Sequence, residues 1–325
     1  MEESKASPSF VTTQSSPSPP VRRAVIDIGT NSVKLLVATI LDGEVTPIEE
    51  CSKQTRLGKG FYESHLLQAD AIAATAAAVQ KFTALAEELR AENIRIIATS
   101  AARDANNASE LLEVIERASG FKVEIISGEQ EADWVFQGVT SDPRFAGRPL
   151  LILDVGGGST EFILGENKLQ CFRNSYRLGT VRLLEQLTLG DPPGTQALEN
   201  CRAILRRFFE EEIVPKLSPA LKKTTRPVQL VGTGGTTSIL ARMEKALPEF
   251  DRAAIESTCL SLAQITAHAE RLWNLSLEER KKIIGLPAKR ADVILTGLVI
   301  YEAVGRYFGF QELHISTRGL RFAAL

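Results

Sequence analysis

Two short stretches place an acid, glycines and hydroxyls directly after an apolar run. The first is Asp27-Ile28-Gly29-Thr30-Asn31-Ser32, and the second runs from Asp154 to Glu161 as DVGGGSTE. Glycine lets a ligand approach the backbone closely, and adjacent N–H groups can form a nest that binds phosphate. The carboxylate of Asp154 could hold a cation beside that phosphate, since Mg²⁺ prefers oxygen ligands. An isolated glycine run is more often a plain tight hairpin, so the interpretation depends on the repetition.

That repetition extends to the flanking residues. In both copies an apolar strand leads into Asp, an apolar residue, Gly, small or polar residues and a second apolar strand. The copies lie about one domain length apart. We interpret them as a duplicated unit in which each half offers a phosphate loop to a shared cleft. Chance recurrence of a hairpin is the alternative.

Three further segments carry groups suited to an anion. The strand Ile94–Ala98 runs into Thr99 and Arg103, and arginine binds phosphate in bidentate fashion. The strand 228–231 precedes GTGGT at 232–236, which has neither the Rossmann spacing nor the lysine of a P-loop. A basic segment spans 278–292 and could form a rim for an anionic substrate. A surface salt bridge for Arg103 and a solvated helix end for the basic segment are the alternatives.

Composition bounds the class of protein. The chain has 325 residues, 44% hydrophobic and 24% charged, as in an ordinary globular protein of two domains. A net charge of −2 argues against a dedicated nucleic-acid or membrane-surface binder. The four cysteines are far apart and predict buried free thiols, and with three scattered histidines a zinc site is not expected. No apolar run is long enough for a membrane span and no signal peptide is evident, so we expect the cytoplasm.

Periodicity and turn residues give the expected organisation. We predict a disordered tail at 1–21, a first domain at 22–143 and a second at 144–325, with the last segment packing back on the first domain. The turn-rich stretch 138–149 is the expected crossing between domains. Helices are expected at 70–92, 197–217 and 294–308, together with a strand at 312–315.

These motifs together resemble the exopolyphosphatase / guanosine pentaphosphate phosphohydrolase (Ppx/GppA) family. The resemblance covers about residues 22–325 and includes TSAAR at 99–103, SGEQEA at 127–132, Arg290-Ala291-Asp292 and the ending Gly319-Leu320-Arg321. It implies an α/β, actin-like (sugar kinase/Hsp70-like, ribonuclease H-like) duplicated fold with the active site between two domains. It also implies Mg²⁺-dependent cleavage of a terminal phosphoanhydride, with polyphosphate or pppGpp as substrate.

The same resemblance implies roles for individual residues. Glu131 matches the proposed base, and Asp154 and Glu161 match metal-linked catalytic acids, with Asp27 as a further metal ligand. The expected phosphate-binding residues are Thr30, Asn31, Ser32, Arg103, Gly156, Gly157, Gly158, Ser159, Thr160, Gly234, Gly235 and Thr236. The chain departs from the family at Gln130 and Asp133, where Glu and Arg are common. The missing cation at 133 predicts a weaker grip on long polyanions.

Polyphosphate is the preferred substrate of this interpretation, with short chains favoured and Arg280, Lys281, Lys282, Lys289 and Arg290 as candidate contacts. For pppGpp, the GTGGT turn would have to hold the base. An actin-like ATP-dependent kinase and a non-catalytic polyphosphate binder are the rival functions, and a homodimer is left open. Phosphate release without an acceptor would separate a hydrolase from a kinase.

Overall fold

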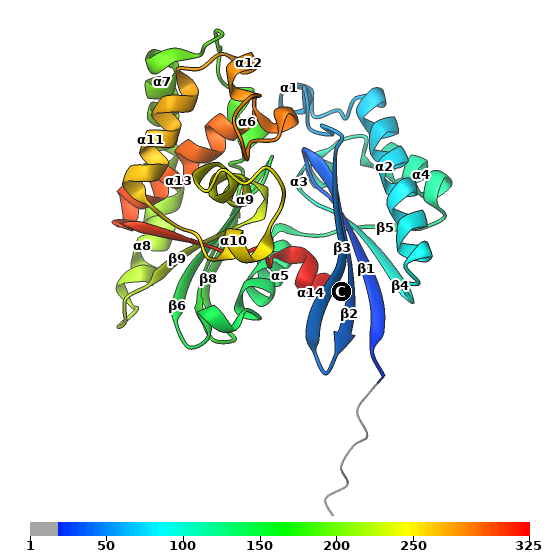
Figure 1. Cartoon of the computed structure of the whole chain (residues 1–325). Helices are drawn as coiled ribbons and strands as arrows, with labels where there is room; N and C mark the ends of the chain where they lie inside the picture. The colour runs from blue at the N-terminus through cyan, green and yellow to red at the C-terminus, as the bar shows by residue number, and fades with distance from the viewer. Residues whose placement is uncertain (1–18) are drawn as a thin grey trace, which may run out of the picture.

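The computed structural model describes residues 19–325, so the expected tail lies mostly outside the described residues. The first of two sheets has five strands in the order β3-β2-β1-β4-β5 (Figure 1). Its strands are β1 (Val21–Ile28), β2 (Ser32–Leu41), β3 (Glu44–Gln54), β4 (Asn93–Ala98) and β5 (Val123–Ile125).

The second sheet has six strands in the order β10-β11-β9-β6-β7-β8. Its strands are β6 (Pro149–Val155), β7 (Thr160–Glu166), β8 (Leu169–Tyr176), β9 (Gln229–Thr233), β10 (Cys259–Ser261) and β11 (Glu312–Ile315). The expected strand at 312–315 has these bounds.

Both sheets repeat one topology. In the first, β1, β2 and β3 form an antiparallel meander, and β4 and β5 continue parallel to β1. In the second, β6, β7 and β8 form the meander, and β9 and β11 continue in parallel, with β10 added at the edge. This repetition confirms the duplicated unit that the repeated hairpins predicted and the actin-like α/β fold that the family resemblance implied.

Helices cover the outer faces of both sheets (Figure 1). The first half contains α1 (Phe61–Ser64), α2 (Ala69–Glu88), α3 (Ser100–Asp104) and α4 (Ala108–Ser119). The remaining helices are α5 (Gly128–Thr140), η1 (Pro143–Phe145), α6 (Thr180–Leu184), α7 (Gly194–Phe208), η2 (Phe209–Ile213), α8 (Val214–Lys222), α9 (Gly234–Glu244), α10 (Arg252–Glu256), α11 (Leu262–Trp273), α12 (Leu277–Arg280), η3 (Ala288–Arg290), α13 (Ile294–Phe308) and α14 (Leu320–Ala324). Among the described residues, no helix combines the length and apolar character needed to cross a membrane.

The helix expected at 197–217 is longer and irregular. It runs through α7, η2 and α8 from Gly194 to Lys222, and η2 is a stretch of wider π-type turn. Pro215 follows directly, and a proline in a helix lacks an N–H and clashes with the carbonyl four residues before it. The wider turn accommodates that clash, because π-bulges and prolines are the usual places where a helix adjusts.

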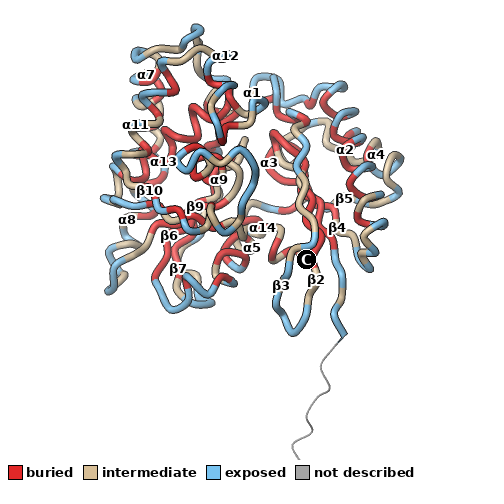
Figure 2. Tube along the Cα trace, viewed as in Figure 1, coloured by how far each residue is buried: buried red, intermediate tan, exposed pale blue. Residues whose placement is uncertain are grey.

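Each sheet has its own core, and a third core joins the halves. The sheets of both halves contain many buried residues (Figure 2). Val25 and Ile97 of the first sheet share one buried cluster with Ile152 and Ile163 of the second. Because strand side chains alternate, these residues mark the faces of the two sheets that meet.

Helices α5 and α14 fill this junction. Helix α5 packs on β7 and β8, so the chain already joins the second sheet at α5, earlier than the crossing expected at 138–149. Helix α14 packs on α5 and β1, and Phe322 contacts Leu36 and Ala38 of β2. Helix α14 therefore covers part of strands β1 and β2 of the first sheet.

Candidate active site

A cavity of about 490 Å³ lies where the two halves meet. Its walls come from the hairpins β1–β2 and β6–β7, from the turn before α9 and from the first turn of α5. It is lined by these residues that the sequence singled out: Asp27, Thr30, Asn31, Ser32, Glu131, Asp154, Gly156, Gly157, Gly158, Ser159, Glu161, Gly234, Gly235 and Thr236.

Strand register places the carboxylates. Asp27 lies two residues after Val25 and Asp154 two residues after Ile152, on the faces of the sheets that meet. Across the strands, Asp27 pairs with Lys34 and Asp154 pairs with Glu161. The alternation of the strands therefore points all four side chains toward the junction.

The glycines of the second loop let the two halves meet. A Cβ on Gly157 would lie 2.8 Å from Cβ of Thr30, and one on Gly158 would lie 2.5 Å from Oγ of Ser100 and collide with the hydroxyl of Tyr62. Any larger side chain here would push the loops apart. The two predicted phosphate loops are thus in contact, with their backbones at the cavity.

The glycine turn before α9 forms another wall of the cavity. Gly234 has φ +88°, a conformation that favours glycine, and a Cβ there would collide with Oδ1 of Asp154. A Cβ on Gly235 would lie 2.6 Å from Nη2 of Arg290. The backbone of this turn therefore lies against both an acid, Asp154, and a cation, Arg290, of the second half.

Glu131 is held by the cap of its helix and by one arginine. Oγ of Ser127 accepts from the backbone N–H of Gln130, which starts α5 and puts Glu131 in its first turn. Nη1 of Arg103 donates to Oε2 of Glu131 at 3.2 Å and to the carbonyl of Ile126 at 2.9 Å. Arg103 does not line the cavity, its hydrogen bond holds the Glu131 carboxylate, and its expected role as a phosphate ligand stays a prediction.

Burial dominates the electrostatics of the acids. It raises the pKa of Asp27 and Asp154, raises the pKa of Glu161 to about 7 and raises the pKa of Glu131 well above its usual range. Repulsion adds to the shifts, since Glu161 lies near Glu131 and Asp154 lies near Glu161. Lys34 partly offsets the shift at both aspartates.

This acidic cluster fits a divalent cation chemically. Carboxylate oxygens are the ligands that Mg²⁺ prefers, and Oδ1 of Asp27 is buried with no hydrogen-bond partner. Within residues 19–325, no three of these carboxylates have oxygens that all lie within 4.8 Å of one another. Asp27, Asp154 and Glu161 as one ligand set therefore stay a prediction.

Two expectations need correction. Thr160 does not line the cavity, because its buried hydroxyl donates to the carbonyl of Leu178 at 2.6 Å. Arg280, expected on a basic rim, is buried and donates to the carbonyls of Leu272, Leu275 and Ala291. Its guanidinium satisfies helix-end carbonyls, which is a structural role.

Sequence reasoning missed four cations that line the cavity, including Lys53 and Arg242. Lys34 and Arg321 line the cavity and neither was assigned a role. Lys34 is the lone charge in the run Ser32–Leu41, and a lone charge in a buried strand is a signal that could have found it. Arg321 comes from α14, almost the full chain length away, and donates to the carbonyl of Leu35 at 2.7 Å.

Comparison with known proteins assigns the chain to a family. The sequence model of the Ppx/GppA phosphatase family matches residues 36–323. The chain belongs to this family. Its place there agrees with the resemblance of the loop motifs, and the matched segment contains the cavity acids Glu131, Asp154 and Glu161.

Relatives within the Ppx/GppA family include enzymes of two names. Exopolyphosphatase 2 of Mycobacterium tuberculosis is 33% identical over 92% of this chain and 96% of its own length. A guanosine-5'-triphosphate,3'-diphosphate pyrophosphatase of Vibrio cholerae is 30% identical over 93% of this chain but 57% of its own length. This Ppx/GppA chain therefore spans the whole of the first relative and just over half of the second.

Solved structures of the family share the fold. An exopolyphosphatase from Cytophaga hutchinsonii superposes with a TM-score of 0.83 at 28% identity, covering 93% of this chain and 96% of that one. The Aquifex aeolicus Ppx/GppA protein superposes with a TM-score of 0.73 at 33% identity, covering 94% and 96%. The duplicated architecture is thus that of the family.

Proposed function

We propose that this Ppx/GppA phosphatase is an exopolyphosphatase, which hydrolyses the terminal phosphoanhydride of inorganic polyphosphate and releases orthophosphate. One observation carries the proposal: an arginine-held glutamate, Glu131, shares a cavity with two phosphate-type glycine loops and with Asp154 and Glu161. The full-length match to an exopolyphosphatase of similar size supports it.

The loops would hold the terminal phosphoryl group. Residues 157–158 and 30–32 line the cavity, where their backbone N–H groups would donate to phosphate oxygens, whereas the N–H of Gly156 donates to the carbonyl of Ser159. Phosphoryl transfer needs positioning and charge stabilisation more than covalent chemistry from the protein. Two rigid strand ends that meet in one cavity supply the positioning.

Glu131 would take the proton of the attacking water. A raised pKa makes a carboxylate a stronger base near neutral pH, provided that it is ionised. Arg103 lowers the pKa of Glu131 and opposes the shift caused by burial and by Glu161. Arg103 therefore favours the ionised form of the base and, through its hydrogen bond at 3.2 Å, orients the carboxylate.

Mg²⁺ is the cofactor we propose, with Asp154, Glu161 and Asp27 as its protein ligands. When bound, the ion would supply charge neutralisation for the phosphate oxygens. Burial raises the pKa of these carboxyls, so their ionised forms need nearby positive charge. Lys34 and Arg321 supply the protein's own share of it.

A specific observation keeps pppGpp as the second candidate. Phe250 lines the cavity with 48% of its surface exposed, next to Ile239 and Phe322. An exposed aromatic ring at the edge of a phosphate site could stack on a nucleobase. Polyphosphate has no nucleobase, so Phe250→Ala should impair the hydrolysis of pppGpp and leave that of polyphosphate unchanged. Comparing this variant with wild type therefore distinguishes the two substrates.

Orthophosphate release tests the proposal. Wild type is assayed with polyphosphate of defined chain lengths, pppGpp and ATP, each with Mg²⁺ or with a chelator and without any acceptor. We expect wild type to release orthophosphate from polyphosphate in the presence of Mg²⁺ and not in the presence of the chelator. The highest kcat/KM is expected on short chains. Preferred turnover of pppGpp, with a loss in Phe250→Ala, would establish the second candidate. Phosphate transfer that needs an acceptor would identify a kinase, and binding without turnover a non-catalytic binder.

A further inference from the structure

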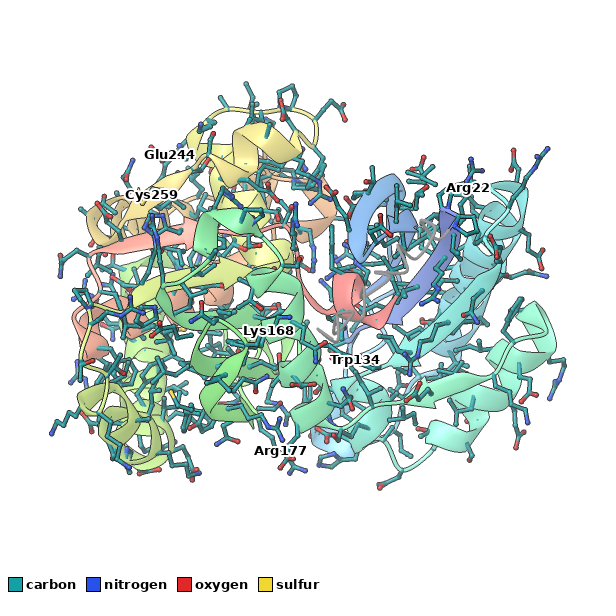
Figure 3. The ribbon with its side chains drawn as sticks, turned by 90° about the horizontal axis from the view of Figure 1, so that it is seen from below. Arg22, Trp134, Lys168, Arg177, Glu244 and Cys259 are labelled. Atoms are coloured by element: carbon teal, nitrogen blue, oxygen red, sulfur yellow. The ribbon has the colours of Figure 1, made fainter. Side chains whose placement is uncertain are left out.

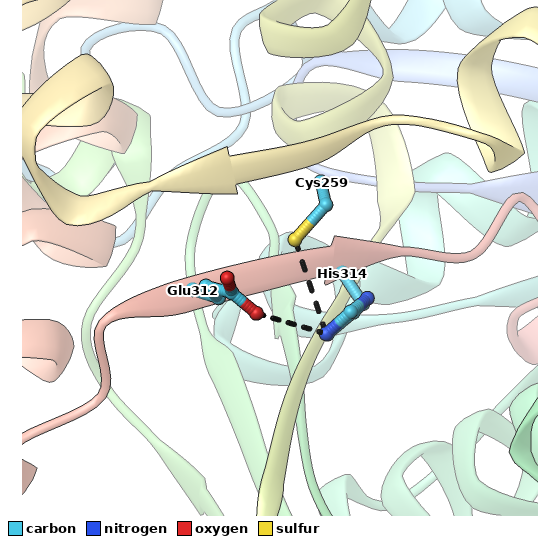
Figure 4. Close-up of side chains that lie close together, drawn as sticks. All are labelled: Cys259, Glu312 and His314. Carbon is cyan, nitrogen blue, oxygen red and sulfur yellow. Dashed lines mark hydrogen bonds and ion pairs between the residues drawn. The ribbon is translucent and has the colours of Figure 1, made fainter.

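A thiol, an imidazole and a carboxylate meet on the outer strand pair of the second sheet. Cys259 on β10 lies directly opposite His314 on β11, and Glu312 precedes His314 by two residues. This register puts the three side chains on one face, where they converge (Figure 4). Sγ of Cys259 lies 3.9 Å from Nε2 of His314, which lies 3.8 Å from Oε2 of Glu312.

The opposite face of β10 and β11 is buried, which holds these two strands in place. Leu260 pairs with Leu313, and both are fully buried in the core of the second half. The backbone N–H of Leu262 donates to the carbonyl of Gln311 at 2.8 Å, just past the paired residues. Donors carried on such rigid strands stay close together before any ion binds.

The spacing of the donors is close to that of a zinc site. Bond lengths near 2.0–2.3 Å in a tetrahedron put neighbouring donor atoms roughly 3.3–3.8 Å apart. All three donor atoms lie within 4.8 Å of one another, so small side-chain rotations would complete the geometry. Cys259 and Glu312 are exposed, which leaves the fourth position open to water.

The donor types select the ion. Sulfur and nitrogen ligands disfavour Mg²⁺ and Ca²⁺, whereas Zn²⁺ accepts cysteine, histidine and carboxylate together. Burial lowers the pKa of His314, so its imidazole is neutral and keeps a free lone pair at neutral pH. The Cys259 thiol would lose its proton on binding, as metal-bound cysteines do.

We propose that Cys259, Glu312 and His314 bind one Zn²⁺ ion at a site separate from the active-site cavity. None of the three lines that cavity, and Cys259 lies on the second half, away from Arg22 of the first (Figure 3). Scattered histidines argued against zinc in the sequence, and the pairing of β10 with β11 removes that argument. Cys259 and Cys171 are also exposed, which corrects the expectation of buried thiols.

The site would also link two segments at the cavity. Helix α10 precedes β10, and Arg252 in it reaches Glu50 of β3. Thr317, just after β11, lines the cavity and bonds to Arg252 and Glu256. An ion that joins β10 to β11 would therefore stabilise the contact between Arg252, which precedes β10, and Thr317, which follows β11.

Cobalt and zinc binding to the whole chain test the proposal. Co²⁺ is titrated into metal-free wild type, Cys259→Ser, His314→Ala and Cys171→Ser, the last being a control for another exposed cysteine in the same sheet. We expect a thiolate-to-cobalt charge-transfer band in wild type and Cys171→Ser, absent in Cys259→Ser. Zinc affinity, measured by competition with a chromophoric chelator, should fall at least ~100-fold in Cys259→Ser and His314→Ala.

Binding by the cavity acids is distinguishable, because carboxylates give no thiolate band. Circular dichroism of the metal-free variants checks that they fold, which is expected since both cysteines are exposed and His314 is only partly buried. Zn²⁺ should raise the thermal midpoint of wild type and not of the two site variants. A wild type without the charge-transfer band, or a band that persists in Cys259→Ser, overturns the proposal, whatever the phosphatase assays show.

Discussion

Lys34 lies directly opposite Asp27 in the antiparallel pairing of β1 with β2. The equivalent pair in the second half is Asp154 with Glu161, so the duplication carries a cation in one copy and an acid in the other. Lys34 lowers the pKa of both Asp27 and Asp154. This asymmetry places a cation, Lys34, among the three hairpin acids Asp27, Asp154 and Glu161 that line the cavity.

Replacing Lys34 with methionine should damage catalysis more than folding. The change keeps an unbranched side chain but removes the positive charge that Asp27 and Asp154 share. We expect kcat/KM for phosphate release to fall ~10–100-fold, the usual size for a lost charged hydrogen bond. Lys168→Met, at an exposed turn outside the cavity, is the matched control. A folded Lys34→Met variant with wild-type kcat/KM would show that the lysine only fills space.

Glu131→Gln tests the base. The amide keeps the size and can still bond to Arg103, but it cannot take a proton. We expect kcat to fall by roughly 10²–10⁴ with little change in KM, as for loss of a general base. Glu129→Gln, an exposed acid in the same helix turn, should leave both constants unchanged. Normal turnover in Glu131→Gln would mean that another group activates the water.

Protein stability should fall as pH rises toward neutrality. The pKa of Glu161 is raised from 4.5 to about 7, so the folded state binds this proton more tightly than the unfolded state. The free energy of unfolding therefore decreases between pH 4.5 and about 7 and levels off above it. Thermal midpoints across this range measure the effect, and Mg²⁺ should reduce it.

Glu161→Gln is the control for that pH dependence. Glutamine cannot ionise, so the thermal midpoint of this variant should vary less between pH 5 and pH 8 than that of wild type. Equal slopes in the two proteins would place the titrating group elsewhere, with Glu131 as the next candidate because its pKa is also raised.

Lys289 should contribute to the grip on polyphosphate. It is exposed and lines the cavity, whereas Lys281 is paired with Glu278 at 2.6 Å and Arg280 is buried. We expect Lys289→Glu to raise KM for polyphosphate threefold to tenfold at low salt, since an exposed charge contributes about 1 kcal/mol. Lys282→Glu, also exposed but outside the cavity, is the control.

Ionic strength gives that prediction a second measurement. The difference in KM between Lys289→Glu and wild type should shrink as salt screens the exposed charge. A larger rise in KM from Lys282→Glu than from Lys289→Glu would contradict this prediction. It would place the main polyphosphate contact at the outer helix end that carries Lys282.

Local pattern was enough to predict the duplicated fold and much of the cavity. The Asp-x-Gly hairpins keep strand, turn and strand within about fifteen residues, so their signal is contained in a short window. Helix α13, an almost wholly buried apolar run, has the predicted bounds 294–308. The loops and acids of the two hairpins line one cavity, with the exception of Thr160, and their roles stay predictions.

The errors and omissions arise from tertiary packing. Arg280 looks like a surface cation because its neighbours Lys281 and Lys282 are exposed, yet the fold turns it toward three carbonyls. The meeting of Cys259 with His314 depends on the register of two strands that are far apart in sequence. Neither fact is contained in a local pattern.

The position of α14 has a consequence for how the protein is made. Phe322 covers Leu36 and Ala38, and Arg321 reaches both Leu35 and Glu50. Helix α14 is synthesised long after β2, so the apolar surface of β2 stays uncovered until α14 has been made, although N-terminal domains commonly fold first during synthesis. A nascent chain, or one truncated before α14, therefore presents an uncovered β2 to chaperones and proteases.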